Sequence, residues 1–310
     1  MTKKLLKDAL LADLSAVNAI LSSLQEDDYV GRMGFEARKE EIETELAGLE
    51  RSRDTLANVA LMFYGKPVHG SRSIATEFAA KALASYQDLV AKHLATSETG
   101  GLAQRGPTPA RQAANLNITG ILHGSFGFLL EESDQDGPQL INSSLREAVD
   151  KVTDVLDHFA AESEDPFNTS LNEMDPRLFS SVKTFFKILH DDEATMRIVE
   201  GEKDRSFDAK AVDRAHQRCQ NASIDEQDLT VTGTLIGVMP YARRFELRIE
   251  DTEVITGKVG PIISQEYLNR IETDERVIGR RWEARLFRKS VDRPGQRTQV
   301  TYTLLELKDL

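Results

Sequence analysis

The chain has 310 residues, of which 51 are acidic and 39 basic, and its formal net charge is -12. A chain of this length has room for about two domains, each with a core of its own. Its single cysteine, Cys219, excludes an internal disulfide, and no Cys/His spacing matches a zinc site, so we expect a reducing, cytoplasmic location without metal or cofactor. No stretch approaches the roughly 18 apolar residues of a membrane-spanning helix, so we expect a soluble protein. The acidic total also disfavours indiscriminate coating of nucleic acid.

Two amphipathic helices are predicted at the start of the chain. Apolar residues recur every three or four positions over residues 5–24, and a second, densely charged run over residues 35–49 has a narrower apolar stripe. The polar break between them contains Gly31 and Gly34, so the two helices are predicted to form an antiparallel hairpin over residues 1–57. The narrow stripe leaves two alternatives: the second helix packs on its neighbour alone, or on a second copy of the chain.

A mixed α+β domain is predicted over residues 58–227. The predicted strands cover residues 58–64, 116–122, 126–130 and 196–199, and the second and third of these form a hairpin. The predicted helices cover residues 74–94, a segment starting at Ser144, residues 176–190 and residues 209–219. These elements lack the regular alternation of a doubly wound parallel sheet, so the predicted class is α+β.

A small β-barrel is predicted over residues 228–310. The predicted strands cover residues 229–235, 245–249, 254–259, 281–287 and 300–307, with a helix over 264–271. Five short alternating strands at this spacing are typical of an SH3-like or an OB-like barrel. Residues 229–310 hold 14 basic and 12 acidic side chains, which gives +2 and leaves -14 for the first 228 residues. This shift in charge supports the proposed domain boundary.

The segment Gly70–Ser73 lies between a predicted strand and a predicted helix. Free backbone N–H groups at a helix start, two hydroxyls and the guanidinium of Arg72 could together hold a phosphate or a carboxylate. The spacing matches neither the P-loop nor the dinucleotide fingerprint. The alternative is ordinary capping of the helix by Ser71 or Ser73, with Arg72 in solvent.

The tripeptide His-Gly-Ser occurs twice, at His69–Ser71 and at His123–Ser125. His69, Ser71, His123 and Ser125 could form a nucleophilic centre if the two copies meet, because a neutral imidazole can take the proton from a serine hydroxyl. The second copy resembles a nucleophile elbow in sequence, but a strand follows it where a helix is required. Both copies are more typical of turns.

Arginines on two predicted barrel strands form a candidate binding surface. Period-two alternation directs Arg244 and Arg248 outward from one strand, and Arg281 and Arg285 outward from another. Small barrels of this kind often bind oligonucleotides or peptides, so a basic stripe here could bind nucleic acid. An acidic residue lies between the two arginines on each strand. The alternative is therefore a salt-bridged surface, or a docking face for the acidic N-terminal region.

We expect a non-enzymatic interaction or adaptor protein that binds protein partners through its helical hairpin and its barrel. Two features support this hypothesis: the charged, exposed helices and the lack of a complete catalytic constellation. The first alternative is a nucleic-acid or nucleotide-sensing component that uses the barrel arginines or the Gly70–Ser73 segment. The second is a hydrolase built on the two His-Gly-Ser turns. A homo-oligomer would form through the N-terminal helices, and no membrane partner is expected.

Overall fold

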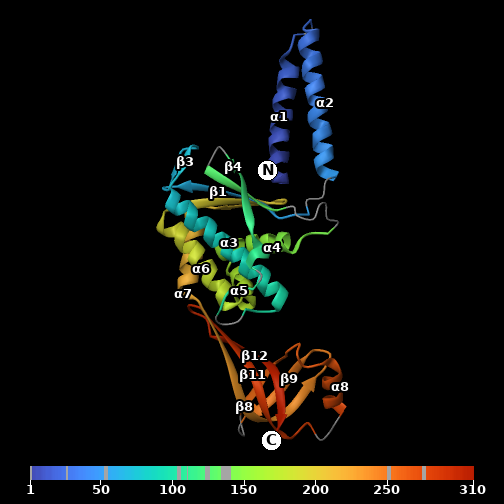
Figure 1. Cartoon of the computed structure of the whole chain (residues 1–310), viewed down its shortest axis with the longest axis vertical. Helices are drawn as coiled ribbons and strands as arrows, with labels where there is room; N and C mark the ends of the chain where they lie inside the picture. The colour runs from blue at the N-terminus through green and yellow to red at the C-terminus, as the bar shows by residue number, and fades with distance from the viewer. Residues whose placement is uncertain are drawn as a thin grey trace. The chain divides into compact units, whose positions relative to one another are not determined.

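The computed structural model describes residues 2–25, 27–51, 55–102, 106–109, 111–122, 126–133, 141–249, 253–273 and 277–310 (Figure 1). The chain divides into two compact units, residues 1–219 and residues 220–310. The first holds a helical hairpin and a mixed α+β region, and the second holds a closed five-stranded barrel. The predicted fold class is therefore confirmed. In the described part of the chain, no helix is both long enough and apolar enough to cross a membrane.

Helices α1 (Lys3–Ser23) and α2 (Tyr29–Arg51) form the N-terminal hairpin. They meet along a narrow seam in which Leu10, Val17 and Ile42 are buried. The seam is narrow because the apolar residues of α2 occupy one thin stripe among charged side chains. Most of the surface of α2 is exposed as a result.

An antiparallel sheet in the order β4–β5–β1–β6–β7 forms the centre of the first unit. Its strands are β1 (Asn58–Gly65), β4 (Leu116–Leu122), β5 (Phe126–Glu132), β6 (Ala194–Glu200) and β7 (Lys203–Phe207). Strand β1 is a continuous apolar run because both of its faces are covered. Helices cover one face, and on the other face Leu5 of α1 packs against Ala60, Met62, Leu129 and Val199.

The helices α3 (Thr76–Thr99), α4 (Ser144–Ala160), α5 (Glu164–Glu173), α6 (Pro176–Asp191) and α7 (Ala209–Asn221) belong to the same unit, and Figure 1 shows them gathered beside the sheet. Asp175 caps α6 as predicted, its carboxylate accepting a hydrogen bond from the Arg177 N–H at 2.8 Å. Ser143, one residue before the predicted start, caps α4.

The predicted cap of α3 is wrong. Ser73 belongs to β3 (Ser73–Ile74), which pairs with β2 (Val68–His69) in a small hairpin, and α3 begins only at Thr76. The N-cap residue is Ala75, which makes no side-chain capping bond. Pairing of Ser73 with His69 in the hairpin removes the serine from the helix start.

The second unit is a barrel that closes in the order β10–β12–β11–β8–β9. Its elements are β8 (Ser223–Met239), β9 (Arg244–Ile249), β10 (Glu253–Val259), α8 (Gln265–Thr273), β11 (Arg281–Asp292) and β12 (Gln299–Asp309). The first three strands form a meander, and the third and fifth strands close the barrel by parallel pairing. This order, with a helix between the third and fourth strands, is that of an OB-like barrel rather than an SH3-like one.

Alternating apolar residues fill the barrel, among them Phe245, Leu247 and Leu286, which are almost fully buried. Gly257 lies on β10, close to β12. A Cβ atom at this position would overlap the carbonyl oxygen of Tyr302, so glycine allows the two strands to approach each other.

Candidate functional sites

Three of the four predicted barrel arginines lie on one continuous outer surface. Arg248 of β9 pairs in register with Thr234 of β8, and Thr234 pairs in register with Arg281 of β11. Residues paired across neighbouring strands point to the same side of a sheet, so Arg248 and Arg281 flank Thr234 on the outside. Arg244 lies four residues before Arg248 on the same face of β9 and is also exposed.

A fourth cation, Lys258, was not predicted. It lies opposite Arg244 in the β9–β10 ladder and is exposed. Strand pairing rather than sequence spacing brings the two together, so the sequence offered no signal for it. Within the described part of the chain, none of the four cations is within ion-pair distance of a carboxylate. We call these four residues the basic face: Arg244, Arg248, Lys258 and Arg281.

Arg285 belongs to a different kind of surface. Its guanidinium lies 2.8 Å from the carboxylate of Asp228, so the two opposite charges offset each other. The hydrogen bond to Asp228 raises the pKa of Arg285, which keeps the guanidinium charged. Glu306 lies opposite Arg285 in the β11–β12 ladder, and Lys308 lies opposite Glu283. This part of the barrel is a surface of alternating opposite charges.

Two carboxylates lie among or beside these cations, as the sequence indicated: Glu246 on β9, and Glu283 two residues after Arg281 on the same face of β11, opposite Lys308. Glu246 sits between Arg244 and Arg248 on β9 and leans over β8, where its Oε2 is 3.5 Å from the Cβ position of Gly237. The absence of a side chain at Gly237 leaves room for this carboxylate. Four cations against these two acids, one of which lies opposite Lys308, give this surface a local excess of positive charge.

The Gly70–Ser73 segment forms the exposed turn of the β2–β3 hairpin, with Gly70 at a φ of +63°. It precedes α3 and does not form its first turn. His69 and Ser71 are both exposed at this hairpin. His123 and Ser125 lie outside the described residues, so the hydrolase alternative and anion binding at Arg72 both stay predictions.

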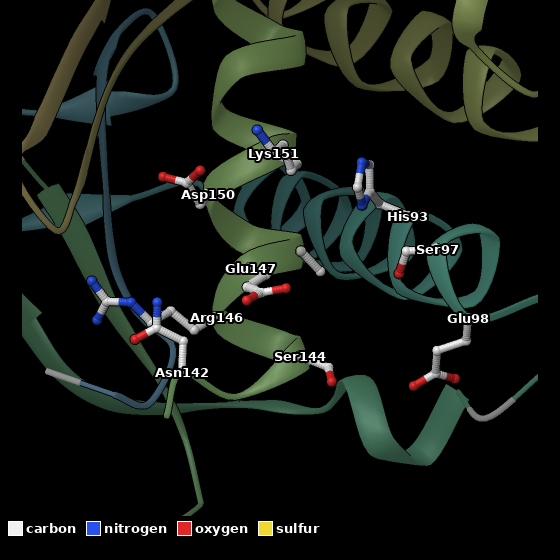
Figure 2. Close-up of a pocket in the computed structure, with 10 residues that line it drawn as sticks. His93, Ser97, Glu98, Asn142, Ser144, Arg146, Glu147, Asp150 and Lys151 are labelled. Atoms are coloured by element: carbon white, nitrogen blue, oxygen red, sulfur yellow. The ribbon is translucent and has the colours of Figure 1, made fainter. Parts of the chain in front are cut away.

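A cavity of about 770 Å³ lies between α3 and α4 (Figure 2). Figure 2 shows His93, Ser97 and Glu98 on α3, facing the side of α4 that carries Glu147 and Lys151. Almost all of its lining is polar or charged, and the remaining residues are Asn142, Ser144, Arg146, Ala148 and Asp150. A smaller cavity of about 380 Å³ shares His93, Ser97 and Lys151 with it.

His93 is the least satisfied polar group of this cavity. Its Nδ1 is buried without a hydrogen-bond partner. Burial and the nearby charge of Lys151 lower the pKa of His93, which keeps the ring neutral at physiological pH. A neutral ring presents one donor and one acceptor nitrogen, so His93 could bind a polar ligand or transfer a proton.

A buried carboxyl lies behind the cavity. Glu200, at the end of β6, is only 3% exposed and is close enough to Asp150 to be affected by its charge. Burial, followed by the charge of Asp150, raises the pKa of Glu200 to about 7. The ammonium of Lys203 lies 2.7 Å from Asp150 and 2.6 Å from Asp154, which holds these carboxylates in place. Nothing in the sequence signalled this cluster, because its members come from α4 and from β6 and β7, which lie far from α4 in the chain.

No cofactor class follows from these groups. In the residues that the structure describes, no group of three or more His, Cys, Asp and Glu side chains is placed to hold a metal ion. Comparison of the chain with protein-family models, with curated proteins and with solved structures finds no match.

Proposed function

We propose that the protein binds single-stranded nucleic acid through the basic face of its barrel. The observation that carries the proposal is the set of four cations that share one outer surface and have no described carboxylate within ion-pair distance. Phosphates bind where several free cations lie together, whereas paired cations such as Arg285 contribute little.

The acidic total of the chain does not oppose this proposal. Charges on exposed groups are screened over about 8 Å at physiological salt, so a phosphate on the basic face responds mainly to nearby side chains. Arg248 and Arg281 are two strand spacings apart, or about 10 Å, and Arg244 and Arg248 are about 13 Å apart along β9. A surface of this size suits a segment of a few nucleotides, as in other small barrels.

The test is the binding of a labelled strand of about 12 thymidines to the full chain, measured by fluorescence anisotropy between about 50 and 200 mM salt. Four neutralised phosphates predict a slope of about -3 in log affinity against log salt. Replacing all four residues of the basic face by glutamine should abolish most of the binding. Equal affinity and slope for this variant, or no binding of the wild type at low salt, would refute the proposal.

A second candidate function is the adaptor role, with the helical hairpin as the docking element for a protein. Tyr29, Val30 and Met33 form an exposed apolar group in the first turns of α2, with exposed fractions of 76%, 79% and 68%. Contiguous exposed apolar side chains are typical of interaction sites. The partner is either a different protein or a second copy of this chain.

Sedimentation over a range of concentrations distinguishes the two kinds of partner. If the hairpin binds a second copy, the wild type should be a dimer that dissociates when the three residues are replaced by serine. If the wild type is a monomer at all concentrations, a second copy is excluded and the expected partner is a different protein. Dimers that persist in the serine variant would exclude this surface as the contact.

A further inference from the structure

We infer that the turn between β8 and β9 recognises unpaired bases, with Tyr241 as a stacking surface and Arg243 as the residue that positions it. This inference rests on the proposed function and specifies its ligand: a strand whose bases are accessible, rather than a duplex. The basic face supplies affinity for phosphates, and the turn adds contact with the bases.

The turn lies directly beside the basic face. Met239 and Arg244 form the last pair of the β8–β9 ladder, and the turn connects them. Tyr241, within the turn, is 92% exposed, and Met239 is 51% exposed. An aromatic ring so far from any internal packing contributes little to the fold, whereas a free aromatic face next to cations is the usual arrangement for stacking on a base.

Arg243 fixes the conformation of this turn. Its backbone has a φ of +48°, and its carbonyl oxygen accepts a hydrogen bond from the N–H of Val259 at 2.7 Å. Its guanidinium donates to the carbonyl oxygens of Gly260 at 2.6 Å and Ile263 at 2.7 Å. It also lies 3.3 Å from Oε1 of Gln265. The donors of Arg243 are therefore used within the protein, and its role is to position the turn.

The same guanidinium anchors a second exposed apolar side chain. Ile262 is 80% exposed and lies in the loop between β10 and α8, whose flanking carbonyls accept the hydrogen bonds of Arg243. Lys258 lies two residues before Gly260 at the start of this loop. Tyr241 and Ile262 are thus apolar groups on two loops that one arginine holds together, each a few residues from a cation of the basic face.

Three probes of equal length test this inference: a thymidine strand, the same sugar-phosphate strand without bases, and a duplex. The wild type should bind the thymidine strand at least about fivefold more tightly than the abasic strand, because one stacked base contributes at least that factor. Tyr241→Ala should remove this preference and leave the salt slope unchanged. Tyr241→Phe should keep it, and Tyr64→Ala, a tyrosine substitution on the other unit, should have no effect.

Arg243→Gln separates positioning from phosphate contact. A positioning role predicts that the preference for the thymidine strand falls while the salt slope stays at its wild-type value. A fall in the slope would show that Arg243 contacts phosphate and would overturn its assigned role. If the wild type binds the thymidine and abasic strands equally and depends on the basic face, the inference fails and the proposed function stands. If it binds neither strand, the proposed function itself fails.

Discussion

Arg248 and Arg281 lie on either side of Thr234 on the outer face of the barrel. They come from strands that are not neighbours in the chain, and β8 runs between them as their common partner. Arg285, only four residues after Arg281 and on the same strand, lies instead against Asp228. Two arginines of similar sequence context therefore have different electrostatic surroundings, and the barrel arrangement determines which of them is available to a ligand.

A double substitution should distinguish the two surfaces. Arg248→Gln with Arg281→Gln should lower the magnitude of the salt slope for a single strand by about 1.4, because two phosphate contacts are lost. The matched control, Arg285→Gln with Lys308→Gln, removes the same charge from residues that face acids, and the slope should stay the same. Fluorescence anisotropy across a salt series measures both. Similar losses in the two variants would indicate a general charge effect.

Closure of the barrel should depend on Gly257. A methyl group there would overlap the carbonyl oxygen of Tyr302, so Gly257→Ala should lower the free energy of unfolding of the barrel by about 1–3 kcal/mol. Trp282 is the only tryptophan of the chain and lies inside the barrel, its Nε1 donating to the Val277 carbonyl oxygen at 3.0 Å. Its fluorescence during urea unfolding therefore reports this unit.

The control for this substitution is Gly237→Ala on β8. The nearest atom to its added methyl group is Oε2 of Glu246 at 3.5 Å, an ordinary contact distance. Gly237→Ala should therefore lower the free energy of unfolding much less than Gly257→Ala does. Equal effects of the two alanines would mean that crowding at Tyr302 does not limit closure.

The sequence predicted the elements whose pattern is strong. Alternation located every barrel strand, and the capping pair Asp175 and Pro176 located the start of α6. Strand β7 and helix α5 were not predicted, because Lys203–Phe207 and Glu164–Glu173 are mostly polar and are held by neighbouring elements. Local sequence patterns could not predict these two elements, because contacts with neighbouring elements determine their structure.

Some residues of the candidate sites were likewise predictable from the sequence, and others were not. Period two correctly directed Arg244, Arg248 and Arg281 outward. It could not show that Lys258 joins them or that Asp228 pairs with Arg285, because both depend on register between strands. The α3–α4 cavity was not predicted either, since its lining comes from two helices that are separated in the chain by a hairpin of strands.

Glu200 should make the first unit less stable as the pH rises through neutrality. Its pKa is raised from 4.5 to about 7 in the folded chain, so between these values the folded state holds a proton that the unfolded state has lost. The free energy of unfolding should therefore fall over this interval, by about 3 kcal/mol in total, and level off about one pH unit above the folded pKa. Below about pH 4 the proton is bound in both states, and the contribution is fully present.

Urea unfolding followed by circular dichroism at a series of pH values measures this effect. Glu200→Gln should remove most of the fall, because the side chain no longer titrates. Glu202→Gln, on the exposed side of the same turn, should retain it. Since the charge of Asp150 contributes to the raised pKa of Glu200, Asp150→Asn should also reduce the fall. A wild-type profile in Glu200→Gln would assign the fall to other groups.

Cys219 should be unreactive until α7 detaches from the core. Its side chain is fully buried, and burial raises the pKa of the thiol to about 12, so the reactive thiolate is scarce in the folded chain. The adjacent Arg218 holds this helix in place by donating hydrogen bonds to the carbonyl oxygens of Phe159 at 2.8 Å and Ala161 at 2.7 Å. Labelling with a thiol reagent should be at least about a hundredfold slower than in denaturant.

Arg218→Met should accelerate this labelling, because it leaves the carbonyl oxygens at the end of α4 without their donor and so favours local opening. The rate should rise about tenfold or more, which corresponds to the loss of roughly 1.4 kcal/mol from the opening free energy. Lys210→Met, an exposed substitution on the same helix, is the control and should label at the wild-type rate. An unchanged rate in Arg218→Met would mean that Cys219 is exposed only by global unfolding that this arginine does not influence.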